Sequence, residues 1–311
     1  MYIGIDIGGT KCAVTKGDAE GNILQKIKFP TTDKENTLKA IFNAVEEMGE
    51  ADAIGVSCGG PLDSKKGLIM SPPNLPGWDN VPIVKMLTEK FNIPAFLQND
   101  ANACALAEWK FGAGKGCENM LFFTFGTGLG AGIILNGKLY EGTNGMAGEA
   151  GHIRLADSGP VGYGKEGSFE GFCSGGGIAR LGKKYAEEKL SAGERVSFCN
   201  SISELENITA KSIAECAFKG NQDAIEIYEI CGAYLGKGLS IIIDILNPER
   251  IVLGSIFQRC ERLLRPKMEE VLKKECLVYA LEVCEIVPAK LGDDIGDYAA
   301  LAIATTNKEA E

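Results

Sequence analysis

The sequence of 311 residues contains only one histidine, and its eleven cysteines form no C-x-x-C pair. An odd, unpatterned set of cysteines is not a disulfide framework, and no signal peptide precedes it. This usage is typical of free thiols in a reducing compartment. We therefore expect a cytoplasmic protein.

Long apolar runs and an excess of basic residues are also missing. No run is long enough to cross a bilayer, which predicts a soluble protein without a membrane partner. Lys and Arg number 32 against 42 Asp and Glu, a formal net charge of −10. Nucleic-acid binding requires a basic face, so the charge predicts no nucleic-acid partner. It does not prevent ATP binding, which depends on local donors and a metal ion.

The composition that remains is that of a globular enzyme. The chain is 45% apolar and 24% charged, and its 40 glycines follow no period. Aperiodic glycine indicates tight turns or ligand-binding loops rather than a fibre. The length allows one large domain or two medium ones.

The first ten residues combine a buried strand pattern with unusual chemistry. Residues 2–8 form an apolar run that contains Asp6, although a lone buried carboxylate is costly. The run is followed by Gly8, Gly9, Thr10 and Lys11. Glycine backbone N–H groups approach an anion closely, and a carboxylate beside them suits a metal ion. The residues alone leave an ordinary hairpin turn as an equal alternative.

A second segment repeats this order. An apolar strand at 120–125 is followed by the turn Gly126-Thr127-Gly128-Leu129-Gly130 and a second strand at 131–135. The turn lacks the full dinucleotide-binding spacing, and a hairpin follows it, which does not favour a Rossmann dehydrogenase. We interpret the repeat as an internal duplication that places two Gly/Thr turns on opposite sides of one nucleotide.

Strands alternate with helices along the chain, which predicts an α/β protein with mixed sheets. The expected strands are residues 2–8, 12–16, 23–29, 53–58, 95–98, 120–125, 131–135, 138–140, 250–254 and 281–287. The expected helices are residues 38–48, 83–91, 101–111, 177–189, 212–219, 223–246, 259–274 and 297–305.

Six ordered motifs give the chain a family resemblance. They are Asp6-Ile-Gly-Gly-Thr-Lys11, Gly60-Pro61-Leu-Asp63, Asn74-Leu-Pro-Gly-Trp78, Asn99-Asp100-Ala-Asn-Ala103, Gly126-Thr-Gly-Leu-Gly130 and Gly148-Glu149-Ala-Gly-His152. With them the chain resembles the repressor–ORF–kinase (ROK) family of sugar kinases over essentially its whole length. The resemblance implies a two-lobed, actin-like ATPase (ribonuclease H-like) fold with a duplicated βββαβα core.

The resemblance also implies a domain organisation. We expect an N-terminal lobe at residues 1–118, with a C-terminal helix at about 295–311 packed back on it. The second lobe is expected at 119–294, with the active site in the cleft between the lobes. The family usually dimerises, so a homodimer is expected.

The activity implied is transfer of the γ-phosphoryl group of ATP to a hexose, with the 6-hydroxyl of glucose as the leading acceptor. The alternative is a kinase of N-acetylmannosamine or another amino sugar or hexose. A more remote alternative is a non-catalytic, sugar-sensing regulator. Regulators of the family carry a helix-turn-helix domain before the phosphate motif, which here starts at the second residue. The intact Asp100 and both phosphate turns also favour the enzyme.

Asp100 is the candidate general base. Its position before a helix favours a simple N-cap on local grounds. The resemblance reverses this, because the family's matching Asp takes the proton of the sugar hydroxyl. Asn99 beside it matches a sugar ligand. A helix N-terminus next to Asp100 would keep its carboxylate ionised.

The remaining site residues follow from the resemblance. The expected ATP-binding residues are Asp6, Gly8, Gly9, Thr10, Lys11, Gly126, Thr127, Gly128 and Gly254, with Asp6 holding Mg²⁺ through water. The expected sugar-binding residues are Gly60, Asn74, Asn99, Asp100, Glu149, His152 and Glu170. A lone histidine such as His152 is more often structural, and Trp78 is as consistent with a core residue as with a cover for the sugar.

One motif departs from the family. Most members carry three cysteines after the histidine, and the four side chains hold a structural zinc. Here those positions are Val161, Tyr163 and Ser168. Zinc requires four ligands in a closed site, so we predict no zinc. The loop at 158–172 is then expected to be held by packing of Val161, Tyr163 and Phe169. A second departure is Ser255 after Gly254, where many relatives have glycine.

Overall fold

The computed structural model describes residues 1–310, with side chains up to Asn307. Its contacts divide the chain into two compact units. The first unit comprises Met1–Phe122, Gly132–Ala147 and the chain from Ala289 onward, and the second comprises Phe123–Ala131 and Gly148–Pro288. The last residue of the expected C-terminal helix, Glu311, lies outside the described residues.

The first unit contains a five-stranded mixed sheet in the order β3-β2-β1-β4-β7. Its strands are β1 (Tyr2–Ile7), β2 (Lys11–Gly17), β3 (Ile23–Pro30), β4 (Ala53–Cys58) and β7 (Ala95–Asn99). The first three strands pair antiparallel, whereas β1 pairs parallel with β4 and β4 with β7. All three parallel strands therefore end at the same edge of the sheet.

Alternation along β1 separates the two faces of this sheet. Ile3, Ile5 and Ile7 are almost fully buried in the core beneath α1 (Lys34–Met48) and α2 (Ile83–Phe91). Asp33 starts α1, because its side chain accepts a hydrogen bond from the N–H of Asn36 at 3.0 Å. A side-chain cap of this kind satisfies one of the orphan donors of a helix.

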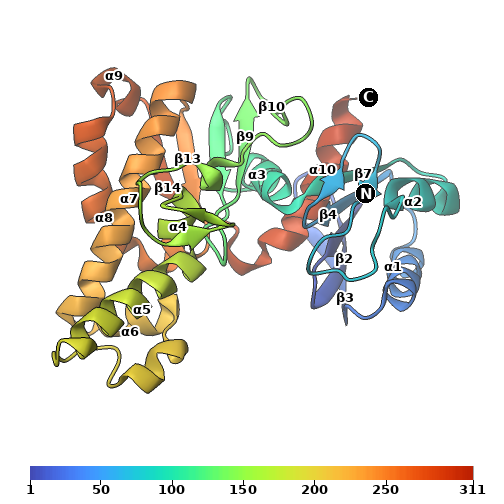
Figure 1. The fold of residues 1–311 in the computed structure, drawn as a ribbon. Coiled ribbons are helices and arrows are strands. Elements are labelled where there is room, and N and C mark those ends of the chain that lie inside the picture. Colours follow the sequence, from blue (N-terminus) through green and yellow to red (C-terminus); the bar gives the residue numbers. More distant parts are fainter. Residues whose placement is uncertain (311) are drawn as a thin grey trace. The chain divides into compact units, whose positions relative to one another are not determined.

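The other face of the sheet is covered by α10 (Ile295–Ala310), which also contacts α3 (Asp100–Phe111). Figure 1 shows β2 and β3 between α1 and α10. The approach of α10 requires glycine on the strands. A Cβ at Gly55 would lie 2.2 Å from the carbonyl oxygen of Ala300, and one at Gly4 would lie 2.7 Å from the nitrogen of Leu301.

The second five-stranded sheet has the order β10-β9-β8-β13-β14. Its strands are β8 (Met120–Phe123), β9 (Ala131–Leu135), β10 (Lys138–Leu139), β13 (Arg250–Leu253) and β14 (Glu285–Pro288). Two of its strand pairs repeat the first sheet: β9 and β10 run antiparallel, and β13 and β14 run parallel. Numbered within each half, both sheets have the same strand order, which supports the predicted duplication.

Helices dominate the second unit. They are α4 (Phe169–Phe172), α5 (Gly175–Ser191), α6 (Ala210–Phe218), α7 (Gln222–Leu246), α8 (Ile256–Glu275) and α9 (Val278–Leu281). The long α7 packs along α8 (Figure 1). Two short hairpins, β5 (Leu62–Asp63) with β6 (Leu68–Ile69) and β11 (Val161–Gly162) with β12 (Lys165–Glu166), and the 3₁₀ turns at Ala150–His152, Ile202–Asn207 and Gly292–Asp294 complete the elements.

Several expected elements have other bounds in the structure. The helix expected at 38–48 begins at Lys34, and the helix expected at 297–305 extends from Ile295 to Ala310. The strand expected at 281–287 is shorter, because residues 278–281 form α9 and only residues 285–288 pair in the sheet. The helix expected to begin at Arg259 begins three residues earlier, because Ser255 and Gln258 form a capping box. Within residues 1–310 no helix has the length and apolar character needed to cross a membrane.

Candidate active site

Three parallel strands bring the N-terminal motifs to one sheet edge. Ile7 on β1 is the register partner of Cys58 on β4, and Cys58 is the partner of Asn99 on β7. The residues that follow these strand ends are therefore neighbours, although they are far apart in sequence. Carboxyl ends of parallel strands are a common position for ligand sites in α/β proteins.

Asp100 is the first residue of α3 and is not its cap. The cap is Asn99, whose Oδ1 accepts the N–H of Asn102 at 2.8 Å. Asp100 Oδ1 accepts the N–H of the next residue, Ala101, at 2.8 Å. Burial raises the pKa of Asp100, and the N–H donors partly oppose this shift. The N-cap explanation for Asp100 is therefore wrong, because Asn99 occupies the cap position.

A buried amide fixes the backbone before Asp100. The Oε1 atom of Gln98, a residue only 7% exposed, accepts the N–H of Asn99 at 2.8 Å. Its Nε2 donates to Glu141 Oε1 at 2.9 Å, and the same oxygen accepts the hydroxyl of Ser64 at 2.8 Å. Gln98 and Glu141 were not predicted from the sequence, because their hydrogen bond joins β7 to the loop after β10, 43 residues further along the chain.

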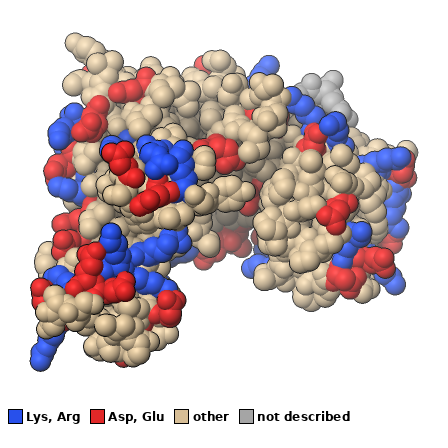
Figure 2. All heavy atoms as spheres, viewed as in Figure 1, with Lys and Arg blue, Asp and Glu red and all other residues tan. Residues whose placement is uncertain are grey.

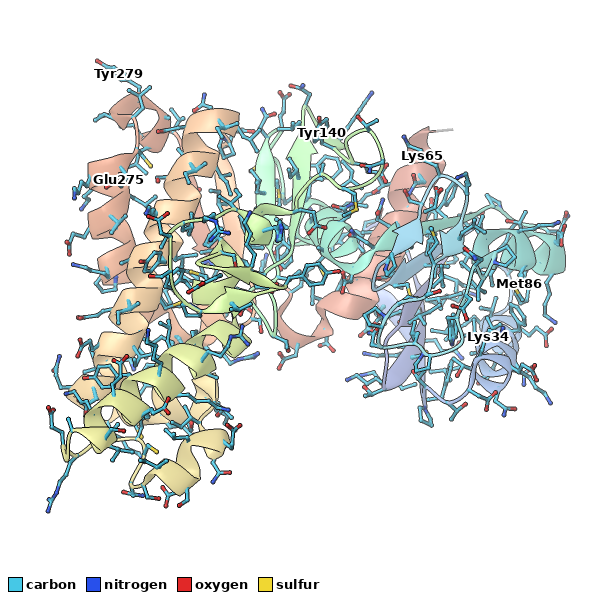
Figure 3. The ribbon with its side chains drawn as sticks, viewed as in Figure 1. Lys34, Lys65, Met86, Tyr140, Glu275 and Tyr279 are labelled. Atoms are coloured by element: carbon cyan, nitrogen blue, oxygen red, sulfur yellow. The ribbon has the colours of Figure 1, made fainter. Side chains whose placement is uncertain are left out.

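This network joins three segments: Ser64 in the turn of the β5–β6 hairpin, Gln98 on β7 and Glu141 after β10. Figure 3 labels Lys65 on that hairpin and Tyr140 just before Glu141. The Nζ atom of Lys65 donates to the carbonyl oxygen of Thr143 at 3.4 Å, next to the Ser64–Glu141 bond. The loop after β10 is thus tied to the segment that contains the Gly60-Pro61 motif.

The first glycine turn lies against a predicted sugar-binding residue. A Cβ at Gly9 would lie 2.7 Å from the carbonyl oxygen of Asn74, so only glycine fits there. The side-chain amide of Asn74 also lies 3.7 Å from the position of a Cβ at Gly59. The turn closes through the N–H of Gly8, which donates to the carbonyl oxygen of Lys11 at 3.1 Å. The structure thus joins two of the predicted motifs and places Gly59, which directly precedes a third, beside them.

Asp6 lies against the first turn of α10. A Cβ at Gly296 would lie 2.8 Å from Asp6 Oδ2. Burial, together with the charges of Asp297 and Asp100, raises the pKa of Asp6 to about 6, although Lys11 and Lys26 oppose the shift. Burial of a carboxylate near others of its kind disfavours the charged form.

Asp297 was not predicted as a site residue. It is only 5% exposed, and its carboxylate accepts the hydroxyl of Thr15 at 3.4 Å and forms an ion pair with Lys26. The sequence placed Asp297 merely at the start of the last helix. Its proximity to Asp6 depends on the packing of α10 across the sheet, which the local pattern does not report.

In the second unit, the Gly126–Gly130 turn follows β8. The N–H of Gly126 donates to the carbonyl oxygen of Gly128 at 3.1 Å, and the N–H of Gly175 donates to the carbonyl oxygen of Gly126 at 2.7 Å. Glu170 Oε2 accepts the N–H of Leu129 at 3.1 Å. The turn is therefore held by the start of α5 and by Glu170, a residue predicted to contact sugar.

Glu149 directly precedes a short 3₁₀ turn that ends at His152, and both residues are exposed. The His152 ring makes an edge contact with the Tyr163 ring, with centroids 6.5 Å apart. The carbonyl oxygen of His152 accepts a hydrogen bond from Lys165 Nζ at 2.8 Å. The backbone of this predicted pair is thus fixed by the β11–β12 hairpin.

The loop at 158–172 is held differently from our prediction. Phe169 is fully buried, as expected, but Val161 is 46% exposed and Tyr163 is 90% exposed. The prediction that Val161 and Tyr163 pack in the core and hold the loop is therefore wrong. Ser168 instead caps α4 by accepting the N–H of Gly171 at 3.1 Å, and Arg154 donates to the carbonyl oxygen of Glu166 at 2.7 Å.

Metal-ligand side chains are sparse around this loop. Within residues 1–307 no three His, Cys, Asp or Glu side chains gather into a metal-binding group. Cys173, the cysteine that follows the loop, directs its Sγ toward the carbonyl oxygen of Cys231 on α7 at 3.5 Å.

Trp78 is 1% exposed, which identifies it as a core residue.

A cavity of about 720 Å³ in the second unit adjoins the glycine turn. The N–H of Gly254, at the end of β13, donates to the carbonyl oxygen of Phe123 at 2.9 Å. Most of the lining is apolar or small. The lining residues are Gly126, Thr127, Gly175, Gly176, Thr209, Ala210, Lys211, Ala214, Glu215, Phe218, Tyr228, Ser255, Ile256, Arg259 and Cys260. A cavity of this size suits a ligand as large as a nucleoside.

The sequence matches a known protein family over nearly its whole length. The family model described as "ROK family" matches residues 2–307. The chain belongs to the ROK family. It is 33% identical to the glucokinase of Streptomyces coelicolor over 312 residues, which cover 98% of this chain and 97% of that protein.

Solved ROK structures agree with the fold. The ROK hexokinase from Thermus thermophilus superposes with a TM-score of 0.83 at 28% identity, covering 100% of this chain and 99% of that one. The ROK glucokinase from Streptomyces griseus, in complex with glucose and AMPPNP, gives 0.76 at 30% identity, covering 98% and 99%. The predicted actin-like, duplicated α/β fold is confirmed.

Proposed function

We propose that this ROK protein is an ATP-dependent glucose kinase that phosphorylates the 6-hydroxyl. The glucokinase and hexokinase relatives support the reaction class. The observation that carries the proposal is the placement of Asp100 at the ends of the parallel strands, with Asn99 serving as the helix cap in its place. A buried aspartate that is not the helix cap, and whose charge acts on Asp6, suits a base.

Asp100 acts as the general base in this proposal. The sugar oxygen forms a bond to the γ-phosphorus, the bond from that phosphorus to the ADP oxygen breaks, and Asp100 accepts the hydroxyl proton. The pKa of Asp100 is raised by burial, which strengthens the carboxylate as a base. Gln98 and Glu141 position this segment through the hydrogen bonds described above.

Sugar binding is proposed for amides, backbone and carboxylates. The Oδ1 atom of Asn99 is used by the helix cap, so Nδ2 is the group that would donate to a hydroxyl. Asn74 beside Gly9 and the Gly60 backbone would contribute further contacts. In the second unit, Glu149 and His152 are exposed and available for hydroxyls, whereas Glu170 holds the glycine turn as well.

ATP is proposed to use both glycine turns. Gly8, Gly9, Thr10 and Lys11 would serve phosphate in the first unit, and Gly126, Thr127, Gly128 and Gly254 would serve the nucleotide in the second. The cavity beside the second turn would take the base and ribose. Its apolar and small lining residues suit an aromatic ring.

Asp6 would hold Mg²⁺ through water. The fit is chemical: burial and two neighbouring acids raise the pKa of its carboxylate, and a divalent cation would offset that repulsion. The bound ion would neutralise phosphate charge during transfer. The proposal also includes a homodimer in the cytoplasm, as expected from the resemblance and the cysteine usage.

The experiment is a coupled ADP-release assay with ATP and Mg²⁺ over a hexose panel that includes glucose, mannose, fructose, N-acetylglucosamine and N-acetylmannosamine. Glucose should give the largest kcat/KM. A larger value for N-acetylmannosamine would replace glucose with the amino-sugar alternative, which the glucokinase relatives do not favour. No turnover on any sugar would overturn the kinase proposal.

A further inference from the structure

The cavity of the second unit is lined by two cationic side chains, Lys211 and Arg259. Lys211 forms an ion pair with Glu215 one turn further along α6, at 3.9 Å. Arg259 lies one turn into α8, and its Nη2 donates to the hydroxyl of Ser255 at 3.1 Å. Figure 1 shows α8 beside α7 in this unit.

Ser255 places this guanidinium next to the glycine turn. Its Oγ lies 3.9 Å from the position that a Cβ on Gly126 would occupy. Gly126, Ser255 and Arg259 all line the same cavity. The arginine is therefore close to the turn that is proposed to bind nucleotide phosphate.

The position of Arg259 does not favour the helix itself. The first turn of α8 contains no acidic residue, and Arg259 adds a positive charge close to this helix end. The N-terminus of a helix carries a partial positive charge, so anions stabilise it and cations do not. An anionic ligand at this end would interact favourably with the helix and with the guanidinium.

The backbone of Ser255 is held in an uncommon conformation, with φ 49° and ψ −101°. Its N–H donates to Gln258 Oε1 at 3.0 Å, which fixes the residue at the start of α8. Positive φ in a residue other than glycine is costly and concentrates at functional sites. In this conformation the serine hydroxyl accepts the hydrogen bond from Arg259.

We propose that Arg259 is a nucleotide-binding residue that binds the phosphate groups of ADP and ATP and does not recognise the base. This inference rests on the proposed function, because it requires ATP in the cavity. A chain with a net charge of −10 repels a polyanion at long range. A cationic side chain at the cavity would offset this repulsion locally. Arginine also matches phosphate geometry with two parallel N–H donors.

The test compares ADP with adenosine by calorimetry, in the wild type and in Arg259→Gln. Because Arg259 is exposed, the expected rise in the Kd for ADP is about threefold to tenfold. The Kd for adenosine should stay within about twofold, because adenosine carries no phosphate for the guanidinium to bind. Arg259→Lys keeps the charge without the planar fork and should give a smaller loss.

The matched control is Lys273→Gln, which removes one exposed charge from the same helix. Lys273 lies about 20 Å along α8 from Arg259, at the 1.5 Å rise per residue of a helix, near Glu275, which Figure 3 labels. The control should leave both dissociation constants unchanged. A general effect of net charge would instead move ADP affinity equally in both variants, and that result would overturn the proposal.

Kinetics give the second readout. In Arg259→Gln the KM for ATP should rise by the same factor as the Kd for ADP, with kcat and the KM for glucose within about twofold. Equal losses of ADP and adenosine affinity, or no loss of either, would overturn the proposal while leaving the kinase function intact. A wild-type protein that binds no ADP and turns over no sugar would overturn the kinase function, and this inference with it.

Discussion

At the scale of single residues, the first unit concentrates negative charge where burial makes it costly. Asp6 lies against Gly296, and Asp297 nearby is only 5% exposed. Lys26 compensates one of these charges through its ion pair with Asp297. The charged form of Asp6 remains unfavourable because of burial and the neighbouring acids, and its pKa is therefore raised to about 6.

Replacing Asp6 by Asn should stabilise the metal-free protein at neutral pH. A folded pKa of about 6 against 3.8 means that the folded state binds the proton more tightly, so stability falls as pH rises from about 4 to about 6. Asn has no such loss, and the variant should gain about 1–3 kcal/mol at about pH 7.5 and almost nothing at about pH 4.

Urea unfolding in buffer with a chelator measures this difference, and Glu47→Gln, a change of an exposed acid on α1, is the control. Equal stability of the Asp6→Asn variant and the wild type at both pH values would contradict the electrostatic argument. Kinase activity should be lost in the same variant if Asp6 holds the metal ion.

Replacing Asp100 by Asn should lower kcat by about 10²–10⁴-fold, the usual value of general acid–base catalysis. Glucose affinity should change little, because the amide keeps the size of the carboxylate. In the wild type, kcat should fall with decreasing pH at a higher pH than an ordinary aspartate would give, since burial raises the pKa of Asp100. Rapid-quench measurements with saturating substrates check both points, and retention of more than a few per cent of the activity would exclude Asp100 as the base.

Individual residues also show which parts of the candidate site the sequence could predict. The Asp6, Gly9 and Asp100 motifs are runs of consecutive residues, so the sequence alone could name them as candidates. Asp297 and Glu141 could not, because each meets its partner only after α10 or the loop after β10 has packed. The identity of the α3 cap was also hidden, since Asn and Asp are nearly equal as caps.

At the scale of elements, the segment from Gly159 to Phe172 is stabilised without metal-ligand cysteines. The β11–β12 hairpin, the Ser168 cap and the buried Phe169 hold it in place. Local patterns could not predict which of its apolar residues face the core. The segment is rich in glycine, so its side chains follow neither a helix nor a strand period.

Metal analysis tests whether this segment binds zinc. The protein should carry far less than one zinc per chain after purification, and a chelator should leave its unfolding temperature unchanged. The reason is that Val161, Tyr163 and Ser168 offer no thiolate. One tightly bound zinc per chain, with a lower unfolding temperature after its removal, would contradict this prediction.

At the scale of the whole molecule, duplication explains why two similar glycine turns exist. Both five-stranded sheets have one strand order, and each carries a glycine turn after its central strand. The order of strands and helices could be predicted from the sequence pattern. The pairing of β13 with β14 could not be placed correctly, because α9 interrupts the apolar run that suggested a longer strand.

Surface charge agrees with small-molecule substrates. On the face drawn in Figure 2, Lys and Arg side chains are interspersed with Asp and Glu. The sequence has ten more acidic than basic residues. Such a surface offers no long-range attraction to a nucleic acid, so recognition of ATP must depend on local groups such as the glycine turns.

The central claim is transfer of phosphate from ATP to the 6-hydroxyl of glucose. Phosphorus NMR of a reaction with glucose, ATP and Mg²⁺ tests it most directly. The account predicts glucose 6-phosphate and ADP in a one-to-one ratio, with neither formed by the Asp100→Asn variant. Inorganic phosphate in place of a sugar phosphate, or a phosphate on another hydroxyl, would contradict it.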